Sequence, residues 1–327
     1  MGTSVVYVKT EDGFELPVID VTNPAFAIRA TEEEMAAMLE QFVRESVQRA
    51  EIPAALQQAL QTSVFGRALM AASGTFLDGM STYRLKLGPE NLGMEATPID
   101  RRIAGSFPAF TSRIRMQDMA RLLAEGLTAA LAGGPQRDLC MVNIGGGAGA
   151  DSWNALIYLQ NEHVGLLAER KIVITALDVD SRGATFGLRA VEALRKPGAP
   201  LSGLDVGFRY LSYEWSETGR LRSTLEEMMA GETLCGVSSE GALFEYGSDE
   251  DIVANLRTLR EGTAADAIVV GSVTRDGAAV QASARASRVA TRPRTLDGFR
   301  GLAERGGWVL QEVIERPFSY NVRMVKA

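Results

Sequence analysis

The stretch LCMVNIGGGAGADSW, residues 139–153, combines the residue types from which nucleotide-type binding sites are built. An apolar run leads into four glycines within the five residues Gly145–Gly149, and the acid Asp151 follows. Glycines at a strand-to-helix turn let a ligand approach the backbone closely, and the amides at the helix N-terminus then face that ligand. The stretch therefore predicts a ligand site at the start of a helix.

Two ligand classes fit this loop, a dinucleotide and S-adenosylmethionine (SAM). Gly145, Gly147 and Gly149 match the pattern GxGxG. Gly145, Gly147 and Ala150 also match the dinucleotide pattern GxGxxG/A. Asp178 ends the next apolar run, VITALDVD, where a carboxylate can accept hydrogen bonds from both ribose hydroxyls. Both ligand classes use such an acid, so these residues predict a nucleoside without choosing between them.

The chain after residue 135 alternates between apolar strands and helices, and this alternation predicts a parallel sheet with helices on both faces. Five strands are expected within residues 138–144, 171–180, 205–215, 232–241 and 264–274. Two more, within 308–317 and 319–327, are too close together for a crossover and must pair antiparallel. A dinucleotide fold usually continues with parallel strands and a separate catalytic domain. The closing hairpin therefore favours SAM.

The N-terminal third has a different texture. Residues 4–21 alternate and turn at Asp12-Gly13, which predicts a β-hairpin. Helical periodicity then begins at Thr31, recurs over 53–73 and returns over 112–134, with an irregular stretch over 74–110. These patterns predict two units, a hairpin and helical lid over residues 1–134 and a SAM-binding domain over residues 135–327.

Composition narrows the function classes. The 327 residues carry a net charge of −7, which argues against nucleic acid as a partner. The lone His163 and the two cysteines, Cys140 and Cys235, are too few for a zinc site of the usual kind, and no metal is expected. Neither a membrane span nor a signal segment is apparent, so we expect a cytoplasmic protein with both cysteines in its core. The expected partners are a small-molecule substrate and, as an open question, a second copy of the chain.

Residues 138–327 resemble a class I SAM-dependent methyltransferase, with its Rossmann-like, doubly wound α/β sheet of seven strands and a reversed last strand. In that family the glycine loop cradles the amino-acid end of SAM, the acid after the second strand binds the ribose, and the next residue lies beside adenine. Asn143 stands where the family usually has an acid. The residues that the resemblance implies for SAM are Asn143, Gly145, Gly146, Gly147, Gly149, Asp151, Asp178, Val179, Asp180, Tyr213, Glu214, Trp215, Ser238 and Ser239.

The segment from Val237 to Asp249 follows the fourth strand, at the family's position for the methyl-accepting group. The Asn/Asp-Pro-Pro-aromatic signature of DNA and amide N-methyltransferases is missing there. Glu240 is a candidate general base or amine-orienting group, with a structural anchor of the loop as the alternative. Tyr246 is a candidate for positioning the acceptor or for contacting the sulfonium through its ring face. The candidates for binding substrate are Met80, Tyr83, Arg84, Phe107, Arg113 and Phe244. The cations of the irregular stretch and the start of the next helix fit either an anionic substrate or ordinary salt bridges; they are Arg84, Lys86, Arg101, Arg102, Arg113 and Arg115.

Together these observations predict a SAM-dependent methyltransferase (EC 2.1.1.-) that acts on an oxygen, nitrogen or carbon atom of a small molecule. The acceptor would displace S-adenosylhomocysteine, and the rate would come mainly from holding the two reactants in line. Two alternatives stay open. One is a SAM-binding enzyme of other chemistry, such as aminopropyl transfer or cyclisation, and the other is a protein that binds SAM without turnover.

Overall fold

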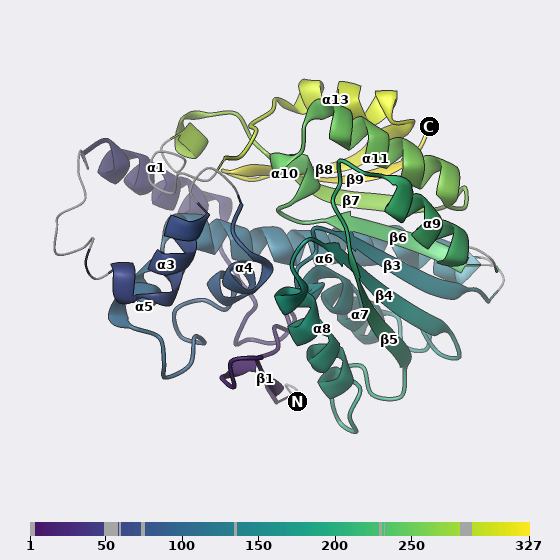
Figure 1. Ribbon diagram of the computed structural model, residues 1–327, viewed down its shortest axis with the longest axis horizontal. Helices are drawn as coiled ribbons and strands as arrows, with labels where there is room; N and C mark the ends of the chain where they lie inside the picture. Colours follow the sequence, from purple (N-terminus) through teal and green to yellow (C-terminus); the bar gives the residue numbers. More distant parts are fainter. Residues whose placement is uncertain are drawn as a thin grey trace.

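A computed structural model describes residues 4–48, 58, 60–72, 76–133, 136–228, 231, 233–281 and 290–327 (Figure 1). The N-terminal elements are β1 (Tyr7–Lys9), β2 (Glu15–Pro17), α1 (Glu32–Gln48), α3 (Val64–Ala71), α4 (Gly79–Lys86), α5 (Pro98–Ala104) and α6 (Phe107–Gly133). They are followed by β3 (Asp138–Ile144), α7 (Ala150–Glu162), β4 (Lys171–Asp178), α8 (Ser181–Leu194), β5 (Asp205–Ser212), α9 (Gly219–Met228) and β6 (Thr233–Ser239). The last are α10 (Leu243–Tyr246), α11 (Asp249–Gly262), β7 (Ile268–Thr274), α13 (Leu296–Arg305), β8 (Trp308–Glu315) and β9 (Ser319–Lys326).

The large sheet has seven strands in the order β5-β4-β3-β6-β7-β9-β8. The first five of these strands are parallel, whereas β9 runs antiparallel to both β7 and β8. The chain winds outward from β3 in both directions, so the strand order reverses between β3 and β6. The predicted α/β fold of seven strands with a reversed last strand is confirmed.

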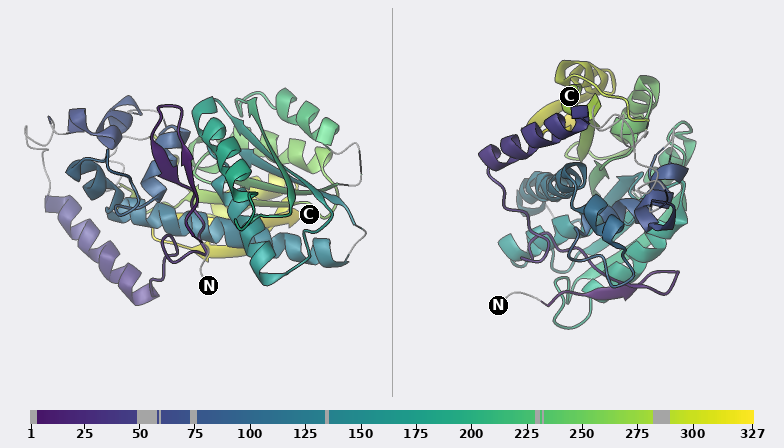
Figure 2. Two further views of the ribbon diagram at one scale, coloured as in Figure 1. Left: turned by 90° about the horizontal axis from the view of Figure 1, so that it is seen from below. Right: turned by 90° about the vertical axis from the view of Figure 1, so that its left-hand side faces the viewer.

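Each face of the sheet carries its own hydrophobic core, because alternate strand residues point to opposite faces. Leu139 and Met141 of β3 pack with α6, α7 and α8, while Cys140 and Val142 pack with α9, α11 and α13. Figures 1 and 2 show the helices of the two sets on opposite sides of the sheet. Both cysteines are buried and free, as predicted for core residues.

The predicted hairpin is confirmed as β1 and β2, and it is fastened to the rest of the molecule by side-chain hydrogen bonds. Tyr83 of α4 donates from its hydroxyl to Pro17 O at 2.8 Å and accepts from Ile19 N at 2.9 Å. Trp153 Nε1 of α7 donates to Ile19 O at 2.8 Å. The chain after β2 is therefore clamped between an N-terminal helix and a helix of the sheet domain.

The stretch over 74–110 is more regular than its sequence suggested, since it contains α4 and α5. Asp78 caps α4 by accepting from the amides of Met80 and Ser81, and Thr97 forms a capping box with Asp100 at the start of α5. The prediction of irregular structure was wrong because helices of seven or eight residues give little periodic signal.

Other boundaries shift by less. The helix expected from Ser112 begins at Phe107, and the one expected over 151–170 ends at Glu162, before a turn in which Gly165 has φ +87°. Part of the helix expected over 53–73 lies outside the described residues. Core residues from both sides of position 134 belong to one cluster, and α6 packs on the sheet, so the two predicted units share their interior. None of the helices in the described ranges is long and apolar enough to cross a membrane.

Tyr83→Phe should destabilise the protein by about 1–3 kcal/mol, because the buried Ile19 amide and Pro17 carbonyl lose their shared hydroxyl partner. Urea unfolding monitored by circular dichroism measures the effect. The matched control is Tyr7→Phe, since Tyr7 is 55% exposed and its variant should unfold like the wild type. Equal stability of the two variants would show that the clamp contributes nothing.

Candidate functional site

A cavity lies at the carboxyl ends of β3, β4 and β6, where the strand order reverses, the usual place for ligands in doubly wound sheets. The predicted SAM residues that line this first cavity are Gly145, Gly146, Gly147, Asp151, Asp178, Val179, Asp180, Tyr213 and Trp215. The other predicted SAM residues do not line it: Asn143, Ser238 and Ser239 are buried, Gly149 forms the N-cap of α7, and Glu214 is exposed. The structure thus brings most of the predicted set to one place.

The glycine loop adopts the backbone conformations that require glycine. Gly145, Gly147 and Gly149 have φ values of +64°, +51° and +73°. Part of the close approach comes from the protein itself, since a Cβ on Gly147 would lie 3.1 Å from Gly79 Cα. A Cβ on Gly183 of α8 would lie 2.8 Å from the Gly147 carbonyl carbon. A side chain at Gly147 would therefore disturb the packing of α4 as well as a ligand.

Asp178 is held at the cavity wall by the glycine loop. Its Oδ2 accepts from Gly147 N at 2.8 Å, and its Oδ1 accepts from Asp180 N at 3.0 Å. Burial raises the pKa of this carboxyl above its ordinary range, although the two amides oppose the shift. Each oxygen retains a second lone pair for a ligand hydroxyl. Asp180 is engaged elsewhere, because it caps α8 and pairs with Arg182.

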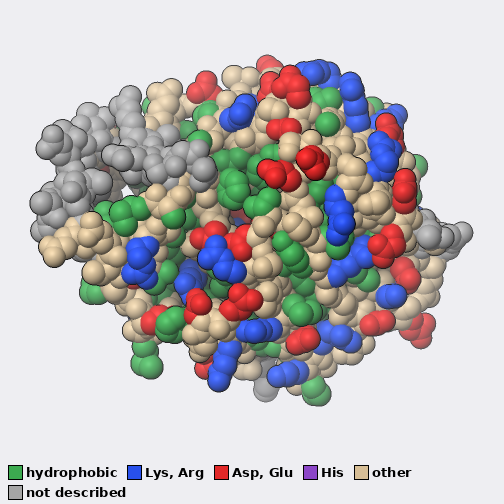
Figure 3. Space-filling view, in the orientation of Figure 1, with side chains coloured by type: hydrophobic (Ala, Val, Ile, Leu, Met, Phe, Trp, Pro, Cys, Tyr) green, Lys and Arg blue, Asp and Glu red, His purple; other side chains and the backbone are tan. Residues whose placement is uncertain are grey.

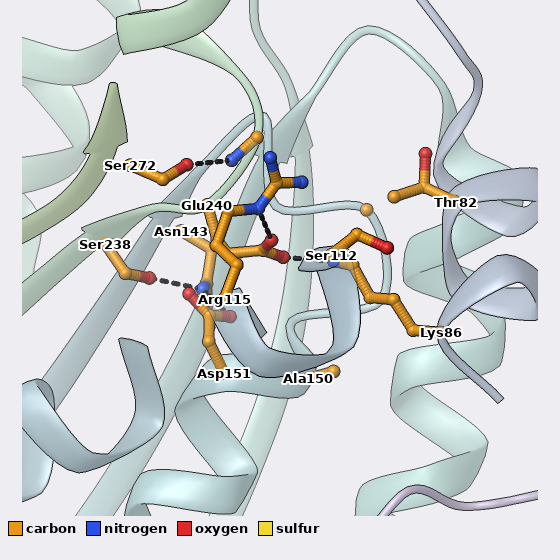
Figure 4. Close-up of polar contacts among 12 residues, drawn as sticks. Thr82, Lys86, Ser112, Arg115, Asn143, Ala150, Asp151, Ser238, Glu240 and Ser272 are labelled. Atoms are coloured by element: carbon orange, nitrogen blue, oxygen red, sulfur yellow. Dashed lines mark hydrogen bonds and ion pairs between the residues drawn. The ribbon is translucent and has the colours of Figure 1, made fainter. Parts of the chain in front are cut away.

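Asp151 carries a carboxylate oxygen without a partner. Its Oδ1 accepts from Asn143 Nδ2 at 2.6 Å, and the same nitrogen contacts Ser238 Oγ at 2.6 Å (Figure 4). Oδ2 is buried and makes no hydrogen bond within the described residues, and Asp151 lines the first cavity. Burial raises the pKa of this carboxyl. A cationic donor placed in the cavity would satisfy Oδ2 and stabilise the ionised form.

The other end of the first cavity is aromatic. Trp215 and Phe76 both line it and contact each other as tilted rings with centroids 6.1 Å apart, and Val179, which also lines it, has an exposed apolar side chain. Tyr213 is buried and donates from its hydroxyl to Asn255 Oδ1 at 2.5 Å, so its ring forms a fixed wall. This end is suited to a flat, partly apolar group.

A buried network of four charged side chains joins the N-terminal helices to the loop after β6 and to α10. Figure 4 shows three of them, Lys86, Arg115 and Glu240. Glu240 pairs with Lys86 of α4 through Oε2 and with Arg115 of α6 through Oε1, the latter at 2.5 Å. Arg115 Nη1 also pairs with Glu245 Oε1 of α10 at 2.6 Å. Gly241 N donates to Ser272 Oγ at 2.9 Å, which fixes the intervening loop.

The two acids of this network differ in their tendency to hold a proton. Burial raises the pKa of Glu240, but Lys86 and Arg115 outweigh it and hold the value below the ordinary range. Burial raises the pKa of Glu245, and the nearby Glu240 adds to this, against the opposing charge of Arg115. A carboxylate with two cationic partners is a weak proton acceptor. This geometry favours the anchoring role of Glu240 over the role of general base.

A second cavity of about 320 Å³ adjoins the first. Leu77, Thr82, Gly241 and Tyr246 line both, so the two cavities meet at these residues. Burial raises the pKa of the Tyr246 hydroxyl, which keeps it protonated. Figure 3 shows hydrophobic side chains and charged side chains of both signs gathered around a hollow on this face. The volume lies within the range of small-molecule pockets.

The predicted substrate residues mostly lie elsewhere. Tyr83 lines the first cavity, but its hydroxyl is occupied by the hairpin. Met80, Arg84, Phe107, Arg113 and Phe244 line neither cavity. Their surroundings explain this, since they pack against core side chains, the Phe14 ring, Phe318, the Gly88 backbone and Phe299, respectively. The assignment of these five residues to the substrate stays a prediction.

Sequence reasoning left Phe76, Arg115 and Glu245 out of the candidate site. Arg115 and Lys86 stood among the cations noted between residues 80 and 115, but nothing in the local pattern distinguished them from the surface arginines nearby. Their partners lie 125 and 154 residues away in the chain, beyond the reach of any spacing argument. Among the described residues no cluster of His, Cys, Asp or Glu is arranged to hold a metal ion.

The fold has counterparts among solved structures. A structure described as a possible exported protein from Bordetella parapertussis is 18% identical, with a TM-score of 0.56 over 91% of this chain and 97% of that one. Magnesium protoporphyrin IX methyltransferase from Synechocystis PCC 6803 is 12% identical, with a TM-score of 0.44 over 69% and 92%. The O-methyltransferase NcsB1 from neocarzinostatin biosynthesis is 17% identical, with a TM-score of 0.42 over 98% and 81%.

No family model matches the sequence, and no curated protein matches it. The likeness to the Bordetella structure supports the fold alone, and the two methyltransferase likenesses, with TM-scores below 0.5, carry no argument about function. What this chain does has to be inferred from its own cavities.

Glu240 and Glu245 should change stability with pH in opposite directions. The pKa of Glu240 lies below its ordinary 4.5, so its stabilisation is complete above pH 4.5 and is lost as the pH falls through the folded-state value. Glu240→Gln should cost about 3–5 kcal/mol at pH 7 and less below pH 4.5. The pKa of Glu245 lies above 4.5, so its ionisation costs stability, and Glu245→Gln should become less destabilising as the pH rises.

Urea unfolding between pH 4 and pH 8 measures both differences from the wild type. Glu125→Gln is the control, since Glu125 lies on α6 but is largely exposed, and its variant should follow the wild-type curve. Parallel curves for all three variants would contradict the assigned charge states.

Proposed function

We propose that the protein transfers a methyl group from SAM to a small molecule bound in the second cavity. The observation that carries this proposal is the composition of the first cavity, where a glycine loop, the hydrogen-bonded Asp178 and the unpartnered Asp151 oxygen line one wall. These groups match a ligand that has a ribose and a cationic amino group. The strand order of the sheet, with its reversed last hairpin, agrees with this ligand.

Each part of SAM has candidate partners among the residues that line the first cavity. Asp178 would accept hydrogen bonds from the ribose hydroxyls. Asp151 would accept from the ammonium of SAM, because Asn143 stands at the position where the family usually has an acid. Trp215 and Tyr213 would contact the adenine ring. When bound, SAM supplies a methyl group activated by a sulfonium.

Binding requires the cover of the first cavity to shift. The cavity measures about 60 Å³, well below the 300–1,000 Å³ typical of small-molecule sites. Phe76, Asp78 and Gly79 line it from the N-terminal side, with Gly79 against the glycine loop. SAM would therefore enter when residues 76–78 move outward. The return of these residues would exclude water from the junction of the cavities.

The acceptor would reach the methyl group through the junction at Leu77, Thr82, Gly241 and Tyr246. Tyr246 is held protonated and can donate a hydrogen bond that orients the acceptor. The ion pairs of Glu240 with Lys86 and Arg115 would keep α4 and α6 in position around the junction. A cytoplasmic location and a role in small-molecule metabolism belong to the same proposal, and cell fractionation tests the location.

SAM or S-adenosylhomocysteine should raise the melting temperature, and NAD should not. A ligand that binds the folded state at about 100 times its dissociation constant adds about 2.7 kcal/mol of stability. Differential scanning fluorimetry measures the shift, and incubation with methyl-labelled SAM and metabolite extracts then tests turnover. A shift with NAD alone would overturn the proposal. A shift with SAM but without labelled product would indicate a binding protein, and another transferred group would indicate other SAM chemistry.

Asp151→Asn should separate the stability of the protein from its affinity for SAM. The pKa of Asp151 is raised above its ordinary 3.8, so its ionised form costs stability at neutral pH and the neutral amide removes that cost. The unliganded variant should melt at or above the wild-type temperature at pH 8. Its SAM affinity should fall about 10- to 100-fold, the loss of a hydrogen bond to a charged group.

Isothermal titration calorimetry with SAM measures that affinity. Asp205→Asn is the matched control, because Asp205 lies exposed at the start of β5 and its variant should bind SAM like the wild type. Unchanged SAM affinity in Asp151→Asn would remove the ammonium assignment while leaving the ribose assignment at Asp178 untouched.

A further inference from the structure

The second cavity exposes a mainly apolar surface with hydroxyl groups set into it. Aromatic and aliphatic side chains such as Phe65, Leu69 and Ile103 line it, together with serine and threonine residues such as Ser112 and Thr274. Arg115 and Glu245 are its only charged lining residues within the part of the chain that the structure describes. A ligand that fills this cavity therefore has a largely apolar body, and its polar end meets this charged pair.

Arg115 retains donors that the protein does not use. Its Nε bonds to Glu240 and its Nη1 to Glu245, and these are the hydrogen bonds it makes among the described residues. Nη2 is not sealed from solvent, and the side chain keeps 15% of its surface exposed. A Cβ on Gly241 would lie 2.5 Å from Nη2. Because Gly241 lines both cavities, Nη2 lies at their junction.

The charges around Nη2 favour an anion. Glu240 is compensated by Lys86 as well as by Arg115, so it leaves part of the guanidinium charge unbalanced. Glu245 gives up its charge most readily, since burial and Glu240 both raise its pKa. A cation at this end would be repelled by the guanidinium, and a wholly apolar end would leave Nη2 desolvated without a partner.

We propose that the second cavity binds an apolar small molecule that carries one negatively charged group, anchored by Nη2 of Arg115 at the junction of the cavities. The proposal rests on the proposed function in treating this molecule as the methyl acceptor. Its anchoring by Arg115 requires neither SAM nor turnover. The anchor places the charged end of the acceptor, rather than its apolar body, next to the first cavity.

Two fluorescent probes of similar shape test the anchor, anionic 8-anilinonaphthalene-1-sulfonate and uncharged N-phenyl-1-naphthylamine. The wild type should bind the anionic probe at least tenfold more tightly, because only the sulfonate reaches the guanidinium. Arg115→Met should weaken the anionic probe by about 10- to 100-fold and leave the uncharged one within about twofold. Arg121→Met is the matched control, since Arg121 lies on the same helix but is exposed outside both cavities.

Two further variants keep the test valid if Arg115→Met unfolds. Glu245→Gln should bind the anionic probe at least as tightly as the wild type, because the amide can carry no negative charge beside Arg115. The double variant Arg115→Met/Glu245→Gln keeps the Lys86–Glu240 ion pair and has no charge at either substituted position. It should bind the anionic probe as weakly as Arg115→Met does. Circular dichroism and the melting temperature confirm that each variant is folded.

Two results would overturn the anchor. One is an equal loss of affinity for both probes in the variants at Arg115, and the other is an unchanged affinity for the anionic probe in those variants when they are folded. The SAM melting shift measured on the same proteins separates this outcome from failure of the proposed function. A wild type that binds the anionic probe through Arg115 but ignores SAM refutes the methyl-transfer proposal alone. A wild type that binds SAM but does not distinguish the two probes refutes the anchor alone.

Discussion

The ion pairs of Glu240 with Lys86 and Arg115 hold the N-terminal helices against the sheet domain. Lys86 comes from α4, Arg115 from α6 and Glu240 from the loop after β6, so the network fixes two helices of the N-terminal region over the open edge of the sheet. Burying such charges is costly, and a hydrophobic replacement would often be as stable. Its presence between two cavities is therefore better explained by the charge environment it gives a ligand than by stability alone.

A backbone contact imposes a second constraint on the same edge. The first turn of α4 lies against the glycine loop closely enough that Gly79, Gly147 and Gly183 exclude one another's side chains. The loop glycines thus serve two purposes, the positive φ of the turn and the packing of three backbones. Because α4 also carries Tyr83 and Lys86, movement of its N-terminal end is resisted by the hairpin clamp and by the ion pairs. The cover of the first cavity is consequently tied to the rest of the N-terminal region.

The sequence was most informative where the signal was local. Alternating strands and helices, the short connection between β8 and β9 and the glycine loop predicted the sheet, its reversal and the first cavity. It was least informative for contacts between distant segments, such as Arg115 with Glu240, and for short helices such as α4 and α5. The arginines near residue 100 illustrate the limit, since Arg113 and Arg115 are two positions apart and only the second reaches a cavity. Which one does so depends on the face that α6 presents to the sheet.

The apparent departure at Asn143 has a physical explanation in the fold. The amide of Asn143 donates to Asp151 and contacts Ser238, so the acid of this site lies at the start of α7, in the cavity wall, instead of in β3. The first cavity then offers Asp151 Oδ2, which has no hydrogen-bond partner among the described residues, and the second offers Nη2 of Arg115. Glu240, paired with two cations, lies between them. A cationic cofactor and an anionic acceptor would each complete the hydrogen bonding of one cavity. Because the two cavities meet, the opposite charges of the two ligands would also attract one another across a poorly solvated junction, where such attraction is strong. The arrangement of charges therefore favours simultaneous occupation of both cavities over occupation of either one alone.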